Sequence, residues 1–315
     1  MTSPLPTLVN TFGQDLKRRY GFPVHKLAIH AGFTCPNRDG SKGKGGCTFC
    51  NNASFGPNAR QEPDIPAQIE AGRRVIAKRT HAAHFIAYFQ TYTNTYADVE
   101  ELDRLYRTAL NEPGVIGLSV GTRPDCVQPE VLELLCRYRD EGYEVWVELG
   151  LQSAFDETLR RVNRGHGFAE YQATARAVRS HGLPLCTHLI IGLPGETGYH
   201  AQRTLDRVIN EGVDGLKLHP LHVVKGTQLA NQWRRGEYQP LTQNNYIQIA
   251  ANLVEQTPPE VSFHRLTGTA SPSILLAPDW CSRKWVVIDG IAEELLRRGS
   301  RQGSALTGAP LTAAV

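Results

Sequence analysis

Short apolar runs alternate with amphipathic segments along most of this sequence, and this alternation restricts the possible folds more than any other feature. The runs have the length of strands, whereas the segments between them carry apolar residues three and four positions apart. Such a pattern predicts an α/β fold in which parallel strands are joined by right-handed helical crossovers. The sheet either curls into a barrel or partial barrel or stays open as a doubly wound sheet. The expected strands are Lys26–His30, His84–Phe89, Val115–Gly121, Glu144–Leu149, Leu185–Ile191 and Gly215–His219, and the expected helices are Ile69–Lys78, Val99–Leu110, Pro129–Arg139, Tyr171–Ser180 and His200–Asn210.

The alternation weakens after about residue 222. Beyond it we expect a helix over Tyr246–Glu255, a short strand over Val261–His264 and a last helix over Lys284–Arg298. We interpret residues 1–222 as the core barrel and residues 223–300 as an extension packed on it. Residues 301–315 are small and polar without periodicity, which predicts a flexible tail.

Polar or glycine-rich segments follow each expected strand. The carboxyl ends of parallel strands meet at one edge of a sheet, and ligands bind at this edge both in barrels and in open sheets. We therefore expect one functional site there, assembled from segments far apart in the sequence. These segments begin at Cys35, Gln90, Arg123, Gln152, Gly192 and His219.

Three cysteines, Cys35, Cys47 and Cys50, lie in one glycine-rich segment after the first expected strand. Four thiolates would close a structural zinc site or an electron-transfer cluster, whereas three leave one metal position open for a ligand that is not protein. The short pair Cys47-x2-Cys50 occurs in zinc sites and in iron-sulfur sites alike. The pair alone therefore leaves two interpretations, an iron-sulfur cluster or a zinc site completed by a histidine such as His30.

The charge balance gives little evidence for a nucleic-acid or membrane partner. The chain has 34 basic and 31 acidic residues, for a formal net charge of +3. No stretch approaches the roughly 20 apolar residues that cross a bilayer, and the first residues lack the apolar segment of a secretion signal. We expect a cytoplasmic protein without membrane contact. Its seven cysteines then read as thiols or metal ligands, because a reducing compartment disfavours disulfides.

The arrangement Cys-x11-Cys-x2-Cys, with Phe49 directly before the last cysteine, resembles the cluster motif of radical S-adenosylmethionine (SAM) enzymes. The commonest form of that motif has three residues in the first gap, so eleven is a departure. Other segments resemble successive blocks of the YhcC-like radical SAM proteins of bacteria. They resemble less closely the radical SAM half of the Elongator catalytic subunit and the oxygen-independent coproporphyrinogen oxidases. In order, these segments are Tyr88–Tyr96, Gly121–Asp125, Glu148–Ser153, Asn163–His166 and Leu189–Thr197.

This resemblance, which covers roughly residues 15 to 300, implies a partial (β/α)6 TIM-type barrel with a C-terminal extension. It implies that Cys35, Cys47 and Cys50 hold a 4Fe-4S cluster whose fourth iron binds SAM. It also implies an enzyme that cleaves SAM reductively to a 5′-deoxyadenosyl radical, which abstracts hydrogen from an unidentified substrate. The resemblance therefore implies an electron donor of the ferredoxin or flavodoxin type with a low potential, about −400 mV, because the cluster must reduce a sulfonium.

The resemblance also assigns residues to SAM. Phe49 would lie against the adenine. Arg164 follows Gln152 by twelve residues, as does the arginine that pairs with the SAM carboxylate in the porphyrinogen oxidases, and a planar guanidinium suits that carboxylate. The alternative for Arg164 is a solvated surface arginine. Gln152 and Glu148 would hydrogen-bond the ribose or the methionyl amine, and a glutamate within an apolar run needs a partner in any case.

Gln90, Arg123 and His188 complete the expected cofactor-binding set. Gln90 lies in the polar segment after the second strand. Arg123 resembles the arginine of an Elongator block, although that block carries a glutamate where this chain has Gly121. His188 stands where the porphyrinogen oxidases carry an aspartate that contacts the ribose. It either replaces that aspartate or is a core histidine bonded to a backbone carbonyl.

The substrate class stays open between RNA, from the likeness to the Elongator subunit, and a small molecule, from the likeness to the porphyrinogen oxidases. Lys217, His219 and His222 either line the substrate end of the cavity or are structural or solvent-facing. A rival interpretation of the whole chain is a non-enzymatic iron-sulfur or zinc protein that acts as a scaffold or redox sensor.

The remaining cysteines lie outside the motif. Cys136 and Cys186 fall in apolar patterns and are expected in the core. Cys126 follows a polar segment at a strand end and Cys281 lies in a C-terminal loop, so either is a candidate donor of a hydrogen atom to a substrate radical.

Overall fold

The computed structural model describes residues 4–51, 64–78, 80 and 82–306. Its centre is a curled sheet of seven parallel strands in the order β1-β2-β3-β4-β5-β6-β8. The predicted α/β half-barrel is therefore confirmed, with one strand more than the sequence indicated. The strands are β1 Val24–Ile29, β2 His84–Phe89, β3 Val115–Thr122, β4 Glu144–Gln152, β5 Leu185–Ile191, β6 Gly215–Pro220 and β8 Ser262–Arg265.

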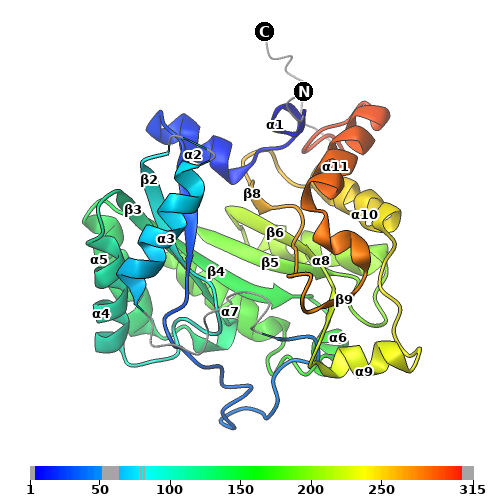
Figure 1. Cartoon of the computed structure of the whole chain (residues 1–315), viewed down its shortest axis with the longest axis horizontal. Coiled ribbons are helices and arrows are strands. Elements are labelled where there is room, and N and C mark those ends of the chain that lie inside the picture. Colours follow the sequence, from blue (N-terminus) through cyan, green and yellow to red (C-terminus); the bar gives the residue numbers. More distant parts are fainter. Residues whose placement is uncertain (1–3, 52–63, 79, 81, 307–315) are drawn as a thin grey trace.

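Helices connect the strands and cover the outer face of the curled sheet (Figure 1). Their apolar residues recur at helical spacing and are buried, as in α4, where Leu102, Leu105, Tyr106 and Ala109 pack into the core. The crossover helices are α3 Ile65–Ala77, α4 Val99–Leu110, α5 Pro129–Asp140, α6 Asp156–Arg161, α7 Phe168–Ser180 and α8 Gly198–Asn210.

The seventh strand comes from the C-terminal part of the chain. The sequence predicted a strand at Val261–His264 within a packed extension, but the structure inserts β8 into the main sheet, parallel to β6. The N-terminal segment stabilises this edge, because Phe263 donates a backbone hydrogen bond to the carbonyl of Asn10 at 2.8 Å. As a result, Arg265 lies beside Lys217 across the strand pair.

The rest of the C-terminal part packs around this edge. It contains α9 Gln228–Arg234, α10 Gln243–Glu255, α11 Lys284–Arg298 and a small antiparallel pair of β7 Val223–Val224 with β9 Leu275–Ala277. Within the predicted flexible tail, residues 302 and 303 are buried. Gln302 donates to the carbonyls of Pro258 and Val261, both at 2.7 Å. Residues 307–315 of that predicted tail lie outside the described residues.

Aromatic side chains close the amino-terminal end of the sheet. Phe12 of α2 (Phe12–Tyr20), which follows the short α1 (Leu5–Leu8), stacks on His264 with ring centroids 3.8 Å apart and meets Trp146 edge-on at 5.1 Å. In Figure 1, α2 lies at the top and the loop after β1 at the bottom, beyond the opposite end of the strands. The described helices include none with both the length and the apolar character needed to cross a membrane.

Candidate cofactor site

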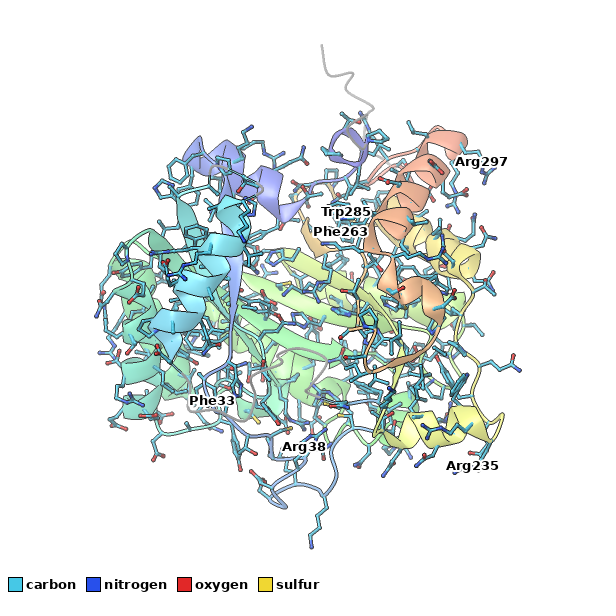
Figure 2. All side chains as sticks on the ribbon, in the orientation of Figure 1. Phe33, Arg38, Arg235, Phe263, Trp285 and Arg297 are labelled. Atoms are coloured by element: carbon cyan, nitrogen blue, oxygen red, sulfur yellow. The ribbon has the colours of Figure 1, made fainter. Side chains whose placement is uncertain are left out.

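A cavity lies at the carboxyl ends of the strands. It brings together residues from segments that are as much as 230 positions apart, and Figure 2 shows one of them, Arg38, in the loop at the bottom of the view. Nine of the ten residues predicted from the sequence line it, and only Glu148 does not. These nine are Cys35, Cys47, Cys50, Phe49, Gln90, Arg123, Gln152, Arg164 and His188.

The cysteine loop is a compact turn. The amide of Arg38 bonds to the carbonyl of Cys35 at 2.8 Å, and the Arg38 guanidinium returns to the carbonyl of Cys50 at 2.6 Å. Gly46 has φ +81°, and a Cβ atom there would lie 2.8 Å from Nε of Arg38, so the loop requires glycine at this position. Arg38 thereby ties the first and last cysteines of the motif together.

Two buried N–H donors point at the sulfur of Cys47. Nδ2 of Asn37 lies 3.7 Å from Sγ and Nη1 of Arg164 lies 3.6 Å from it. Hydrogen bonds of this kind stabilise a thiolate and tune the potential of an iron-sulfur cluster. Burial raises the pKa of the neighbouring Cys50 thiol, as does the charge of Cys47, whereas Arg38 opposes the rise.

The spacing of possible ligand atoms bears on the choice between a zinc site and an iron-sulfur cluster. A tetrahedral zinc site with Zn–S bonds of about 2.3 Å needs sulfurs roughly 3.8 Å apart. Within the described chain, the one trio of possible ligand atoms that all lie within 4.8 Å of one another is Glu148, Cys186 and His188. The three motif cysteines do not form such a trio in this structure, so their sulfurs are not gathered as in a formed zinc site.

Arg164 is buried, and the alternative of a solvated surface arginine is wrong. Its Nη2 donates to the carbonyl of Gly150 at 2.6 Å, and a Cβ atom on Gly150 would lie 2.9 Å from that nitrogen. The described residues include no carboxylate in an ion pair with Arg164, and its buried Nε has no hydrogen-bond partner. Gln152 stands beside it with φ +82°, an unusual conformation for this residue type that turns the end of β4 into the cavity.

Arg123 differs from Arg164 because its charge is already paired. Nε and Nη2 donate to the two oxygens of Asp125, both at 2.9 Å, and Nη1 donates to the backbone carbonyl of Arg164 at 2.8 Å. Although burial opposes it, the hydrogen bond from Arg123 lowers the pKa of Asp125 to about 2. Arg123 lines the cavity, but its hydrogen bonds show a positioning role for the backbone of Arg164, which the sequence did not reveal.

Glu148 lies beneath the cavity and is fully buried. It accepts hydrogen bonds from Lys26 at 2.5 Å, from His188 at 2.6 Å, from Ser119 at 2.5 Å and from Lys217. Burial raises its pKa, but the charges of Lys217 and Lys26 outweigh burial and hold the pKa well below its ordinary value. The structure gives no support to the prediction that Glu148 contacts the ribose or amine of SAM, because Glu148 does not line the cavity and both of its oxygens accept hydrogen bonds from protein groups.

His188 connects this buried network to the cavity. It lines the cavity and bonds to Glu148, so its partner is a carboxylate and not the backbone carbonyl considered above. Burial and the charge of Lys217 lower its pKa to about 4. Although Glu148, Cys186 and His188 are close enough to hold a metal ion, the ammonium groups of Lys26 and Lys217 at the same carboxylate disfavour a cation there.

Of the three residues considered for the substrate end of the cavity, the structure places only one at the cavity wall. His219 lines the cavity, whereas Lys217 is buried behind it with its ammonium 3.9 Å from the ring centroid of Tyr88. His222 is not among the lining residues. The cavity also includes Arg38, Tyr88 and Arg265, which the sequence analysis missed. The strand prediction that ended at His264 stopped one residue short of Arg265.

The four cysteines outside the motif do not line the cavity. Cys186 and Cys281 are fully buried, Cys126 is buried beside Asp125, and Cys136 is partly exposed on α5. Burial raises the pKa of Cys126 and of Cys281 to about 12 in each case. The core placement predicted for Cys186 is therefore confirmed, whereas the hydrogen-donor role considered for Cys126 and Cys281 has no support from the cavity lining.

A family model described as the radical SAM superfamily matches residues 35–208, which is more than half of the chain. The chain belongs to the radical SAM superfamily. A second model, the radical SAM C-terminal domain, matches residues 213–297. The resemblance inferred from the cysteine motif and its downstream blocks is thus confirmed.

Individual relatives show how far the likeness extends. Protein YhcC of Escherichia coli strain K12 is 50% identical over 302 residues, which is 96% of each chain. A tRNA uridine(34) acetyltransferase of Dehalococcoides mccartyi is 32% identical over 173 residues, 53% of this chain and 36% of the relative. The solved Elp3 of Methanocaldococcus infernus superimposes with a TM-score of 0.68 at 18% identity over 89% of this radical SAM chain and 64% of the Elp3 chain, a likeness of fold.

Proposed function

We propose that this protein is a radical SAM enzyme that uses a 4Fe-4S cluster to cleave SAM reductively and to abstract a hydrogen atom from a substrate. Two observations around one cavity support this proposal together: the three thiols of the motif line it, and N–H donors of Asn37 and of Arg164, which has no carboxylate partner among the described residues, are aimed at Cys47. One electron supplied through the bound cluster divides SAM into methionine and a 5′-deoxyadenosyl radical, which takes a hydrogen atom from the substrate and leaves as 5′-deoxyadenosine.

The residues around the cavity would each contribute to binding. Cys35, Cys47 and Cys50 hold three irons and leave the fourth for the amino and carboxylate groups of SAM. Arg164, buried and without an acidic partner, binds that carboxylate, because a guanidinium in a partly desolvated site gains most from an anion. Phe49 packs against the adenine. The remaining polar contacts to SAM come from Gln90, Gln152 and His188.

The electron must come from a donor of low potential, and we infer a ferredoxin or flavodoxin. A cytoplasmic location, where thiols stay reduced, is consistent with three cysteines that serve as metal ligands. For the substrate, the tRNA-modifying relative supports RNA, but its match extends over only part of each chain. The position of the cavity at the carboxyl ends of the strands, where small ligands bind in barrels, supports a small molecule.

The test is anaerobic reconstitution with iron and sulfide followed by SAM and dithionite, with 5′-deoxyadenosine measured by mass spectrometry. We expect about four irons per chain and release of 5′-deoxyadenosine. Cys47→Ser should reduce the rate at least about 100-fold and lower the iron content, since loss even of groups that merely support metal ligands costs 10- to 100-fold. Cys136→Ser is the matched control, because Cys136 does not line the cavity and bonds to the carbonyl of His181.

Two results would contradict the proposal. Purified protein that holds zinc in place of iron would return it to the scaffold interpretation. An iron centre whose spectrum does not change with SAM, and which gives no 5′-deoxyadenosine, would identify a redox sensor.

A further inference from the structure

Arg265 brings a second unpaired guanidinium into the cavity. It ends β8, pairs in register with Lys217 and lines the cavity together with His188 and His219. Its Nη1 donates to Nε2 of His219 at 2.5 Å. In the part of the chain that the structure describes, Arg265 forms no ion pair with a carboxylate. Each of its side-chain nitrogens either has a hydrogen-bond partner or is accessible to solvent.

The surroundings of Arg265 are positive or neutral. Burial lowers the pKa values of His188, His219, His222 and Lys217, and the charge of Arg265 lowers each of them further. The nearest buried carboxylate, Glu148, already binds two lysines and His188. Positive charge is therefore in excess on this wall, which is formed by β5, β6 and β8.

The orientation of Arg265 is fixed by its neutral partner. Because Arg265 donates to Nε2, His219 accepts there and carries its ring proton on Nδ1. Nδ1 in turn packs against Gly268, where a Cβ atom would lie 2.1 Å away. A guanidinium held in place beside a neutral imidazole, partly desolvated and without a counter-charge, is costly unless a ligand supplies the anion.

We propose that Arg265, positioned by His219, binds an anionic group, a carboxylate or a phosphate, of a small-molecule substrate. This inference rests on the proposed function and names the substrate class for the same cavity. The anion differs from the SAM carboxylate, because Arg164 lies beside β4, and two strands separate β4 from β8 in the sheet. A small molecule is favoured over RNA because Arg265 lies at the register of Lys217, inside the strand end at Pro220, in the cavity that must also hold SAM.

The experiment uses reconstituted full-length enzyme and deuterium-labelled cell extract that has been separated on an anion-exchange column. Deuterium transfer into 5′-deoxyadenosine should occur with fractions that the column retains and should survive ribonuclease treatment. Transfer that occurs only with unretained fractions, or that ribonuclease abolishes, would overturn the inference. Phosphatase treatment separates the sources of charge, since loss of transfer identifies a phosphate monoester and its survival identifies a carboxylate or a phosphodiester.

Variants of Arg265 test whether this residue is responsible for the deuterium transfer. In Arg265→Gln, the ratio of deuterated to total 5′-deoxyadenosine should fall roughly tenfold or more, because a charge-assisted hydrogen bond is lost. Arg265→Lys should recover part of that ratio. Arg235→Gln, in an exposed pair with Glu237, is the control and should keep the wild-type ratio. An unchanged ratio in Arg265→Gln would overturn the inference, whereas absence of 5′-deoxyadenosine from the wild-type protein would overturn the proposed function instead.

Discussion

The floor of the cavity and its rim both contain buried charged side chains, but among the residues that the structure describes those on the floor are paired with opposite charges, whereas Arg164 on the rim is not. On the floor, Glu148 is surrounded by Lys26, Lys217, Ser119 and His188, and both of its oxygens are used. On the rim, the described carboxylates leave Arg164 without an ion pair, and its buried Nε has no hydrogen-bond partner. The carboxylate on the floor is therefore satisfied (closed), whereas the guanidinium on the rim has no counter-charge among the described residues (open).

This difference separates residues that stabilise the fold from residues available to a ligand. Buried groups without partners cost stability, and in a cavity a ligand can supply the missing partner. Arg123 shows that an arginine can line the cavity and still belong to the closed class, because Asp125 satisfies it with two hydrogen bonds. Hydrogen-bond state, more than position, thus distinguishes the two roles.

Of the substitutions that test this difference between floor and rim, we expect Glu148→Gln to have the largest effect on stability. Removing the carboxylate leaves Lys26 and Lys217 without their counter-charge beneath the cavity, and we expect a loss of about 3–5 kcal/mol in the free energy of unfolding. Urea denaturation of the apoprotein measures this loss. Glu141→Gln, in an exposed pair with Arg107, is the control and should change the free energy little. A variant of wild-type stability that binds SAM more weakly would instead restore Glu148 as a SAM contact.

The next effect is a dependence of stability on pH. The pKa of His188 is lowered by burial, and further by Lys217, from 6.5 to about 4, so between these values the folded protein binds fewer protons than the unfolded chain. The free energy of unfolding should fall as the pH falls from 6.5 to 4.5, and His188 should account for about 2–3 kcal/mol of the fall. His188→Gln should show a correspondingly smaller fall. If the free energy of unfolding fell equally in the two proteins, protonation of His188 would not destabilise the fold, and His188 would not be part of the closed floor.

Much of the fold could be predicted from sequence because period-two and helical patterns depend on burial alone. The six core strands and the cysteine motif follow from local patterns. Residues that depend on contacts across the chain could not be predicted in the same way. Glu148 appeared to face a ligand because an acidic side chain in an apolar run needs a partner, and nothing in its own segment shows that the partners are Lys26 and Lys217.

Arg265 was missed for a related reason. Its strand is short, its edge position depends on the N-terminal segment at Asn10, and the register shift beside Lys217 places Arg265 toward the cavity. None of these contacts leaves a periodic signal. A local pattern therefore shows that a strand exists, whereas the neighbours of that strand determine which of its side chains meet a ligand.

Arg164→Lys gives a smaller effect that sharpens the comparison, because it keeps the charge of an open rim residue and removes the planar pair of donors. SAM affinity, measured by calorimetry on the reconstituted protein, should weaken roughly tenfold to a hundredfold through loss of a charge-assisted contact. Stability should fall by only about 1–2 kcal/mol, because the hydrogen bonds to the carbonyl of Gly150 and to Sγ of Cys47 are lost. Arg160→Lys is the matched control on exposed α6 and should alter neither quantity. If Arg164→Lys loses stability as Glu148→Gln does but keeps its affinity for SAM, the open rim is a structural layer like the floor, and the division between them fails.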